Sequence, residues 1–217
     1  MENEEGIGRI EPAERVDGAP GAMLVIISGP SGVGKDTIID AVRLRTHEPE
    51  YRYVVTCTTR SRRPGEVDGV DYNFISAREF SALRAAGGFL EANEVHGNFY
   101  GSPRDPVRQA LIAGKDVILK IDVQGAQVVK EQVTEALLIF IIPPSLETLF
   151  HRLRSRATET ADELEVRQRD AAVELARQDD YDHVVVNETG LVGRTADRID
   201  AIIAEERAAH AGRRVRV

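Results

Sequence analysis

The chain has 217 residues, of which 42% are hydrophobic, so it can bury a substantial core within one compact domain. Its net charge of -8 argues against a general nucleic-acid-binding protein, because phosphate contacts require a basic surface. The longest apolar run, residues 136–142, is far shorter than the roughly 20 residues of a membrane-spanning helix, which argues against a membrane protein.

The N-terminal segment is polar and rich in Glu, Gly and Pro, and we expect residues 1–22 to form a disordered tail. It has neither the basic start nor the apolar stretch of a secretory signal, so secretion is not expected. The single cysteine, Cys57, permits no internal disulfide, which fits the reducing cytoplasm. At the other end, the basic residues 211–217 are expected to form a frayed tail.

Between these ends, apolar strands alternate with amphipathic helices, which is typical of a mostly parallel sheet covered by helices on both faces. The predicted strands are 24–28, 52–57, 116–121, 137–142 and 183–186. The predicted helices are 35–45, 103–113, 124–132, 145–154, 161–178 and 195–210. Since each of the first four strands precedes a helix, we expect right-handed crossovers and one continuous sheet.

Between residues 58 and 102 the pattern changes to turns and short half-polar runs, with one predicted helix at 76–86. We interpret residues 58–102 as an inserted β-rich subdomain within a core made of residues 23–57, 103–151 and 179–210. Ligands of open α/β sheets bind at the carboxyl ends of the strands, where this insertion also emerges. The binding site and the insertion are therefore expected to face each other.

A phosphate-binding loop follows the first predicted strand, where GPSGVGK leads from Gly29 to Lys35 and into a helix. Backbone N–H groups of such a loop and the helix N-terminus bind phosphate, and the lysine adds a positive charge for the β and γ phosphates. This motif predicts a nucleoside triphosphate site. We assign ATP binding to the loop and the start of the helix: Gly29, Pro30, Ser31, Gly32, Val33, Gly34, Lys35, Asp36 and Thr37.

Asp36 departs from the usual motif, which has a hydroxyl residue directly after the lysine. A carboxylate there would repel the phosphate oxygens, and Thr37 supplies a hydroxyl one residue later. Two roles remain open for Asp36: it could hold a metal-bound water, or it could lie outside the site as an acid stabilised by the helix dipole. We favour the outer position and therefore assign no direct metal ligand. The five histidines also lack metal-like spacing.

Three arginines, Arg60, Arg62 and Arg63, lie directly before a Pro-Gly turn. This density of guanidinium groups suits bidentate capture of a second phosphate, with the Tyr72 hydroxyl as a further donor. The alternative is an exposed charged run in which nearby acids such as Glu66 pair with the arginines.

Four motifs stand in order along residues 23–208: GPSGVGK, TTRSRRPGEVDGVDYNF, FLEANEVHGNFYGS and IDVQGA. On these motifs the chain resembles the guanylate kinases, and the middle two are much more specific than the phosphate loop. The resemblance implies an α/β fold of the P-loop NTPase type, with a parallel sheet flanked by helices, a GMP-binding insertion and a helical lid at 152–178. It also implies ATP-dependent phosphorylation of GMP, and of dGMP, to GDP, with Mg²⁺ delivered with ATP, by a cytoplasmic monomer or homodimer of purine nucleotide metabolism.

By position, the resemblance assigns GMP binding to the insertion and its flanks. Arg60 and Arg63 match arginines that grip the GMP phosphate, and Glu91 matches the carboxylate that reads guanine. A carboxylate can accept from guanine N1–H and the 2-amino group together, whereas adenine offers neither donor; a strand residue facing solvent is the alternative for Glu91. The full predicted set is Thr56, Arg60, Arg63, Tyr72, Glu91, Tyr100, Ser102 and Asp122.

The arginine-rich residues 152–178 resemble the lid of nucleoside monophosphate kinases. Arg156 and Arg167 match the family's catalytic arginines by spacing, and with Lys35 they form the predicted catalytic set. A lid that closes only on both substrates limits wasteful hydrolysis of ATP. The alternative is an exposed helical hairpin held by pairs of opposite charges four residues apart.

Three further positions flank the strand ends. Asp122 follows an apolar strand and could order magnesium-bound waters. Lys120 stands where many relatives carry an acid, and it could instead meet a phosphate. Asn187 matches the position that contacts the adenine or ribose of ATP, although it also fits a simple turn residue.

Two rival functions are weighed against this one. A loop that reads GKD followed by a hydroxyl residue also resembles the ribose bisphosphate phosphokinases, but such an enzyme has no use for Glu91. A non-catalytic guanylate-kinase-like module that binds proteins could lose Lys35 or the lid arginines, all of which this chain retains.

Overall fold

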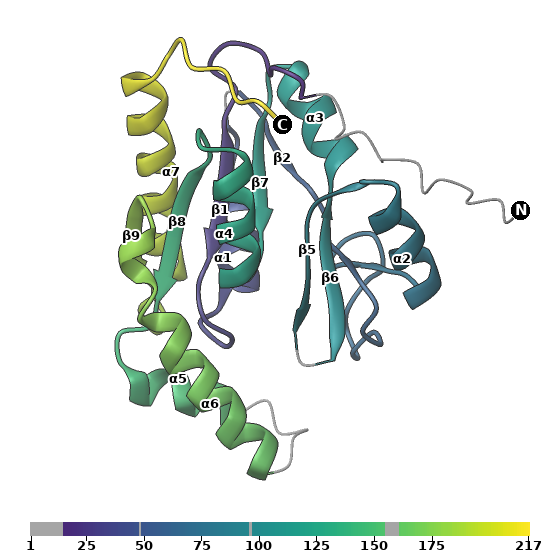
Figure 1. Ribbon diagram of the computed structural model, residues 1–217. Helices are drawn as coiled ribbons and strands as arrows, with labels where there is room; N and C mark the ends of the chain where they lie inside the picture. Colours follow the sequence, from purple (N-terminus) through teal and green to yellow (C-terminus); the bar gives the residue numbers. More distant parts are fainter. Residues whose placement is uncertain (1–14, 48, 96, 155–160) are drawn as a thin grey trace, which may run out of the picture.

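The computed structural model describes residues 15–47, 49–95, 97–154 and 161–217, which form two sheets with helices packed against them (Figure 1). The larger sheet has five parallel strands in the order β2 (Tyr51–Tyr53), β7 (Asp116–Lys120), β1 (Leu24–Ser28), β8 (Leu137–Ile142) and β9 (His183–Val186). The strand before the phosphate loop therefore lies at the centre of the sheet, with β7 on one side and β8 on the other.

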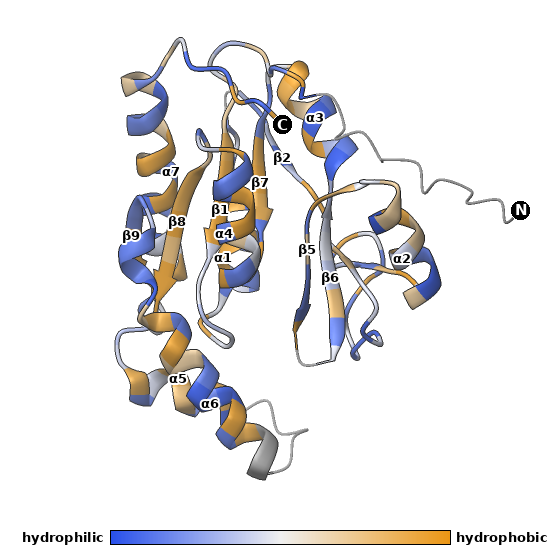
Figure 2. Cartoon of the chain, in the orientation of Figure 1, coloured by the Kyte–Doolittle hydropathy of each residue, from blue (hydrophilic) through white to orange (hydrophobic). Residues whose placement is uncertain are grey.

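Helices cover both faces of this central sheet, as the alternating sequence pattern predicts. On one face, Val25 and Ile27 of β1 pack with residues of α1 (Lys35–Arg43), α5 (Leu146–Arg154) and α7 (Val192–Ala209). On the other face, Leu24 and Ile26 pack with α3 (Arg104–Ile112) and α4 (Val123–Gln132). The three central strands, β7, β1 and β8, are apolar along almost their whole length (Figure 2), as expected for parallel strands that are buried on both sides.

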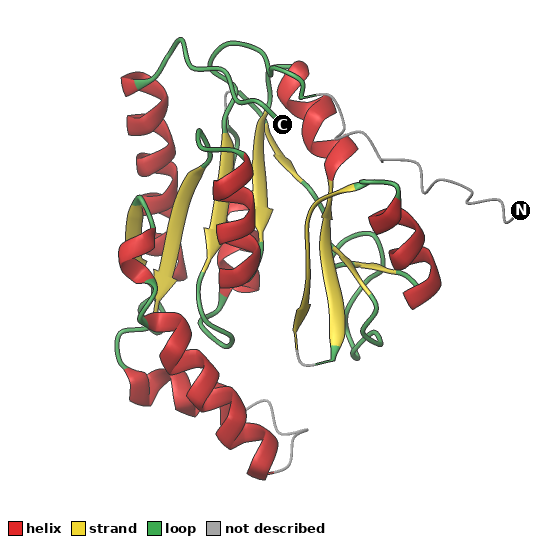
Figure 3. Ribbon diagram, in the orientation of Figure 1, coloured by secondary structure: helices red, strands yellow, loops and turns green. Residues whose placement is uncertain are grey.

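The second sheet is built by the inserted segment and has the strand order β4 (Asn73–Phe74), β3 (Cys57–Thr58), β6 (Asn98–Pro103) and β5 (Phe89–Val95). The helix α2 (Ala77–Ala85) packs on it through Phe80, whose ring lies 4.5 Å from that of Phe89. A capping box between Ser76 and Glu79 begins this helix. Figure 3 shows this sheet beside the central sheet, so the insertion stands next to the carboxyl ends of the central strands.

The predicted strand 52–57 is wrong as one element, because it divides between the two sheets. Val54 N–H still donates to Ile118 O of the central sheet, at 3.3 Å. Two residues later, Thr56 O accepts from Asn73 N–H of the second sheet, at 2.9 Å. The sequence of such a stretch does not reveal where its backbone changes its hydrogen-bonding partner. As a result β2 leads into the insertion and not directly into a helix.

The helix after residue 160 also ends earlier than predicted. The helix α6 (Ala161–Leu175) is followed by a short 3-10 turn at Gln178–Asp180. Residues 155–160, which include the predicted catalytic Arg156, lie outside the described residues.

The first described residues pair with the C-terminal segment, so the predicted frayed tail at 211–217 is wrong. Val16 N–H donates to Val217 O and Gly18 N–H donates to Val215 O, both at 2.8 Å. Val215 and Val217 are buried in the core that lies against α3, because two apolar residues alternate with arginines in this short segment. Of the predicted N-terminal tail, residues 1–14 lie outside the described residues, while Val16, Asp17, Gly18 and Gly21 take part in this pairing.

Candidate functional site

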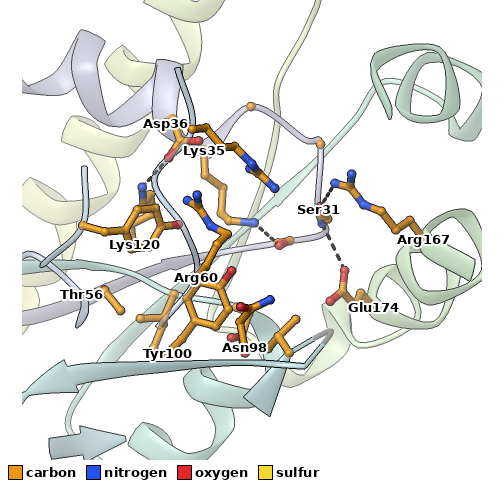
Figure 4. A pocket seen from close by; sticks show the side chains of 18 of the residues that line it. Ser31, Lys35, Asp36, Thr56, Arg60, Asn98, Tyr100, Lys120, Arg167 and Glu174 are labelled. Carbon is orange, nitrogen blue, oxygen red and sulfur yellow. Dashed lines mark hydrogen bonds and ion pairs between the residues drawn. The ribbon is translucent and has the colours of Figure 1, made fainter. Parts of the chain in front are cut away.

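A cavity of about 530 Å³ opens between the phosphate loop, the second sheet and helix α6 (Figure 4). It collects most of the predicted site residues, although they come from widely separated parts of the sequence. Those that line it are Gly29, Ser31, Gly32, Gly34, Lys35, Asp36, Thr56, Arg60, Arg63, Tyr72, Glu91, Tyr100, Asp122 and Arg167.

The phosphate loop joins β1 to α1, and its shape depends on glycine. Gly34 has a φ of 100°, and a Cβ there would lie 2.7 Å from Nδ2 of Asn187. Lys35 turns back over the loop, and its ammonium group donates to the carbonyls of Gly29 and Pro30. Burial lowers the pKa of Lys35, and neighbouring carboxylates, first that of Glu174, oppose this shift. The N-terminus of α1 and the lysine thus form a preorganised site for anions.

Asn187 lies behind this loop and is buried. Its Nδ2 donates to Val33 O at 2.8 Å, and its Oδ1 accepts from the Thr195 hydroxyl at 3.2 Å. Arg152 also donates to Val33 O, at 3.1 Å. The side-chain amide predicted to contact ATP therefore has protein partners at both ends, and it is the loop carbonyl that it contacts. Thr37 is exposed on α1.

Helix α6 reaches the phosphate loop through two side chains on one of its faces. Arg167 Nη2 donates to Ser31 Oγ at 2.7 Å, and Glu174 Oε2 accepts from Ser31 N–H at 3.2 Å. Burial raises the pKa of Glu174, and Lys35 opposes this shift. Sequence analysis missed Glu174, although its spacing of seven residues from Arg167, two helical turns, was the available signal.

Across the cavity, Glu91 of β5 is only 4% exposed. The Ser102 hydroxyl on the paired strand donates to its Oε1 at 2.7 Å, and Asn93 Nδ2 donates to its Oε2 at 2.9 Å. Burial raises the pKa of Glu91 to about 7, and the hydrogen bond from Ser102 limits the increase. The alternative of a solvent-facing residue is therefore wrong. Asn93 was not predicted, although residues two apart on a strand share a face.

The first turn of helix α4 lies against the Glu91 carboxylate. Its first turn is capped by Asp122, which accepts from Gly125 N–H at 2.8 Å. A Cβ on Gly125 would lie 3.0 Å from Oε2 of Glu91. A glycine at this position therefore lets the buried carboxylate approach the helix, and Asp122 lines the cavity beside it.

Arg60 follows strand β3 of the second sheet, and two kinds of contact hold its side chain in place. Its guanidinium group pairs with both oxygens of Glu66, at 2.7 and 2.9 Å, and this hydrogen bonding raises the pKa of Arg60. Its Cζ also lies 5.1 Å from the centre of the Tyr72 ring, which meets the Tyr100 ring edge-on at 6.0 Å. The pairing of an arginine with Glu66, which belongs to the alternative of an exposed charged run, is present, yet Arg60 still lines the cavity. Arg63 is exposed.

Asp36 lies in the first turn of α1, with its side chain 61% exposed, and forms an ion pair with Lys120. Figure 4 shows this pair on one side of the cavity, while Arg167 and Glu174 reach Ser31 from the other side. Lys120 is the last residue of β7, next to β1.

Two further features concern the described residues. Within the described residues, no group of three His, Cys, Asp or Glu side chains could hold a metal ion. None of the helices that the structure describes is long and apolar enough to cross a membrane.

Comparison with known proteins gives one consistent result. The family model described as guanylate kinase matches residues 21–205. The chain is 45% identical to the guanylate kinase of Symbiobacterium thermophilum over 87% of this chain and 88% of that one. It is 47% identical to the guanylate kinase of Gloeobacter violaceus over 87% and 90% of the two chains. The crystal structure of guanylate kinase from Anaplasma phagocytophilum matches with a TM-score of 0.67 and 35% identity over 87% of each chain.

Proposed function

The chain belongs to the guanylate kinase family, and from this we propose that its cavity transfers the γ-phosphate of ATP to the phosphate of GMP. The enzyme is an ATP:GMP phosphotransferase that makes GDP and ADP. The observation that carries the assignment of the cavity is the buried Glu91 carboxylate, which shares it with the phosphate loop.

Guanine selection follows from the chemistry of this carboxylate. Each carboxylate oxygen has two lone pairs, so Glu91 can accept from guanine N1–H and the 2-amino group while it keeps its bonds from Ser102 and Asn93. Adenine would leave the buried carboxylate without these donors, which is costly in a site that excludes water. Thr56 adds a hydroxyl to the same wall of the cavity. The 2′ position of the ribose plays no part in this selection, so we extend the proposal to dGMP.

In the transfer step, an oxygen of the GMP phosphate attacks the γ-phosphorus of ATP, and the bond to the bridging oxygen breaks so that its electron pair leaves with ADP. The attacking phosphate is already an anion, so no general base is needed, and catalysis consists of positioning and charge stabilisation. Lys35 supplies positive charge at the donor phosphates. Arg167 supplies it from the lid, and Arg156 is assigned the same role from the sequence alone.

Guanylate kinases generally use Mg²⁺ with ATP, and we propose the same cofactor here. Mg²⁺ prefers oxygen ligands and keeps several waters, so it needs few protein groups. The described residues offer no three-ligand cluster, which fits an ion that is carried by the nucleotide phosphates. Asp122, which lines the cavity near Lys35, would hold it through bound water. When bound, the ion neutralises phosphate charge.

We propose that ATP and GMP are the partners of this protein, with no nucleic-acid or membrane partner, and that it is a monomer or homodimer in the cytoplasm. A sugar bisphosphate would leave Glu91 without a role, so the ribose bisphosphate phosphokinase is not favoured. A non-catalytic binding module is not favoured either, because Lys35 and Arg167 both face the cavity.

The test is ADP formation from ATP and Mg²⁺ with GMP, dGMP, AMP, UMP, CMP or ribose 1,5-bisphosphate offered separately. We expect turnover with GMP and dGMP only. Turnover confined to the sugar bisphosphate would overturn the role given to Glu91, and no turnover with any acceptor would support the binding module instead.

A further inference from the structure

Lys120 places a positive charge in the cavity that holds the proposed ATP and GMP subsites. Its side chain is 18% exposed and lines the cavity. Its backbone lies beside Ile27 of β1, close to where the phosphate loop begins. Its ammonium nitrogen is 4.9 Å from the centre of the Tyr72 ring.

The guanidinium group of Arg60 contacts the same aromatic ring, with its Cζ 5.1 Å from the ring centre. Two cations therefore lie against Tyr72, and both line the same cavity, where their positive charges would attract an anion. Arg60 has its own carboxylate partner in Glu66, and Lys120 has one in Asp36. An ammonium group has three N–H donors, and the bond to one Asp36 oxygen uses one of them.

We propose that Lys120 is a phosphate-binding residue for the acceptor nucleotide, acting beside Arg60, and that Asp36 positions it. This inference rests on the proposed function, because it takes the anion to be the phosphate of GMP. A cation at the boundary of the two subsites lowers the repulsion between the GMP phosphate and the incoming triphosphate.

The same pair explains how an acid is tolerated directly after Lys35. Asp36 alone would place a negative charge beside the triphosphate site, and the ion pair with Lys120 neutralises it. This second effect must be separated from phosphate binding, because either one alone would make Lys120 important for activity.

The first measurement is the affinity of the ATP-free enzyme for GMP and for guanosine, by calorimetry at pH 7.5. We expect Lys120→Gln to weaken GMP binding by about 10- to 100-fold, as for a lost charged hydrogen bond, and to leave guanosine binding within about twofold of wild type. Lys120→Arg should keep most of the GMP affinity. Lys115→Gln is the matched control, because Lys115 forms an ion pair with the exposed Glu50 and does not line the cavity.

The second measurement is GMP affinity in Asp36→Asn and in the double variant with Lys120→Gln. If Lys120 binds phosphate, the double variant stays as weak as Lys120→Gln. Recovery of wild-type GMP affinity in the double variant would mean that Lys120 only neutralises Asp36, and equal losses for GMP and guanosine would mean that it only supports the fold. Either result overturns the inference.

Two controls keep the test decisive. Lys120→Met, which keeps most of the aliphatic stem, replaces Lys120→Gln if thermal unfolding shows that the glutamine variant does not fold. Wild-type turnover of GMP is measured in parallel. If wild type uses GMP while Lys120→Gln binds it normally, the inference fails and the proposed function stands; if wild type does not use GMP, the proposed function fails first.

Discussion

The proposed donor and acceptor halves of the cavity are built by different physical means. The donor half consists of a glycine loop, a helix N-terminus and one lysine that folds back on the loop carbonyls. The acceptor half consists of side chains that are held by other side chains, such as Glu91 by Ser102 and Arg60 by Glu66. Backbone amides bind any phosphate, whereas placed side chains can distinguish one base from another.

This difference implies that single substitutions should affect the two halves in different ways. A change in the donor half should alter the rate with every acceptor equally. A change in the acceptor half should alter the choice of acceptor, its pH dependence, or both.

Lys35→Ala should cause the largest loss, at least about 10²- to 10³-fold in kcat, because a preorganised charge at the transferred phosphate is removed. GMP affinity in the absence of ATP should stay near that of wild type, since Lys35 belongs to the donor half. Steady-state kinetics and GMP calorimetry measure the two effects. Unchanged turnover would refute the assignment of the phosphate loop.

Glu91→Gln should reduce kcat/KM for GMP by about 10- to 100-fold, as expected when a bidentate base contact worth roughly 1–3 kcal/mol is damaged. The wild-type pH profile sharpens this prediction, because the pKa of Glu91 is about 7. Protonation removes the acceptor that guanine needs, so KM for GMP should rise as the pH falls from about 8 to 6.

The control for this prediction is the glutamine variant itself, which has no proton to gain at this position. Its KM for GMP should be nearly independent of pH over the same range, while KM for ATP should follow the same course in both enzymes. A pH-dependent GMP KM that survives in the variant would assign the titration to another group.

The sequence predicts the donor half more completely than the acceptor half. The motif from Gly29 to Lys35 is local, and the strand, loop and helix around it are where the sequence places them. By contrast, the partners of Glu91 depend on strand pairing, and the pair between Asp36 and Lys120 joins residues 84 positions apart. Residue types alone do not specify such long-range contacts.

The two wrong predictions of the fold, the single strand at 52–57 and the frayed tail at 211–217, have a common physical origin. The predicted strand 52–57 is one continuous stretch in sequence. In the structure β2 ends at Tyr53 in the central sheet and β3 begins at Cys57 in the second sheet, and only the hydrogen-bond partners reveal this division. The C-terminal segment is basic, yet Val215 and Val217 are buried because the N-terminal segment supplies a pairing partner. In both cases tertiary contacts outweigh local composition.

Asn187→Ala tests how the donor half is supported by a residue that contacts the phosphate loop without lining the cavity. If Asn187 supports the loop through Val33 O, the variant should lose about 1–2 kcal/mol of unfolding free energy and raise KM for ATP a few-fold. The preference for ATP over GTP should not change. Denaturant unfolding and kinetics with both donors measure these effects. A lost preference for ATP with full stability would instead indicate that the side chain contacts adenine.

Asn93→Ala should affect GMP alone, and mainly below pH 8, so it is the most selective test of the acceptor half. The hydrogen bond from Asn93 stabilises the charged form of Glu91, so its removal should raise the pKa of Glu91 further above its ordinary range. KM for GMP at pH 7 should rise about 3- to 10-fold, and the midpoint of its pH profile should move upward. At pH 8.5 and saturating GMP, kcat should match wild type, because Asn93 acts through the carboxylate and not on the phosphates.

A loss that is equal at every pH would mean that Asn93 contacts the nucleotide itself. In the Glu91→Gln background the pH shift should vanish, because the group whose charge Asn93 stabilises is no longer there.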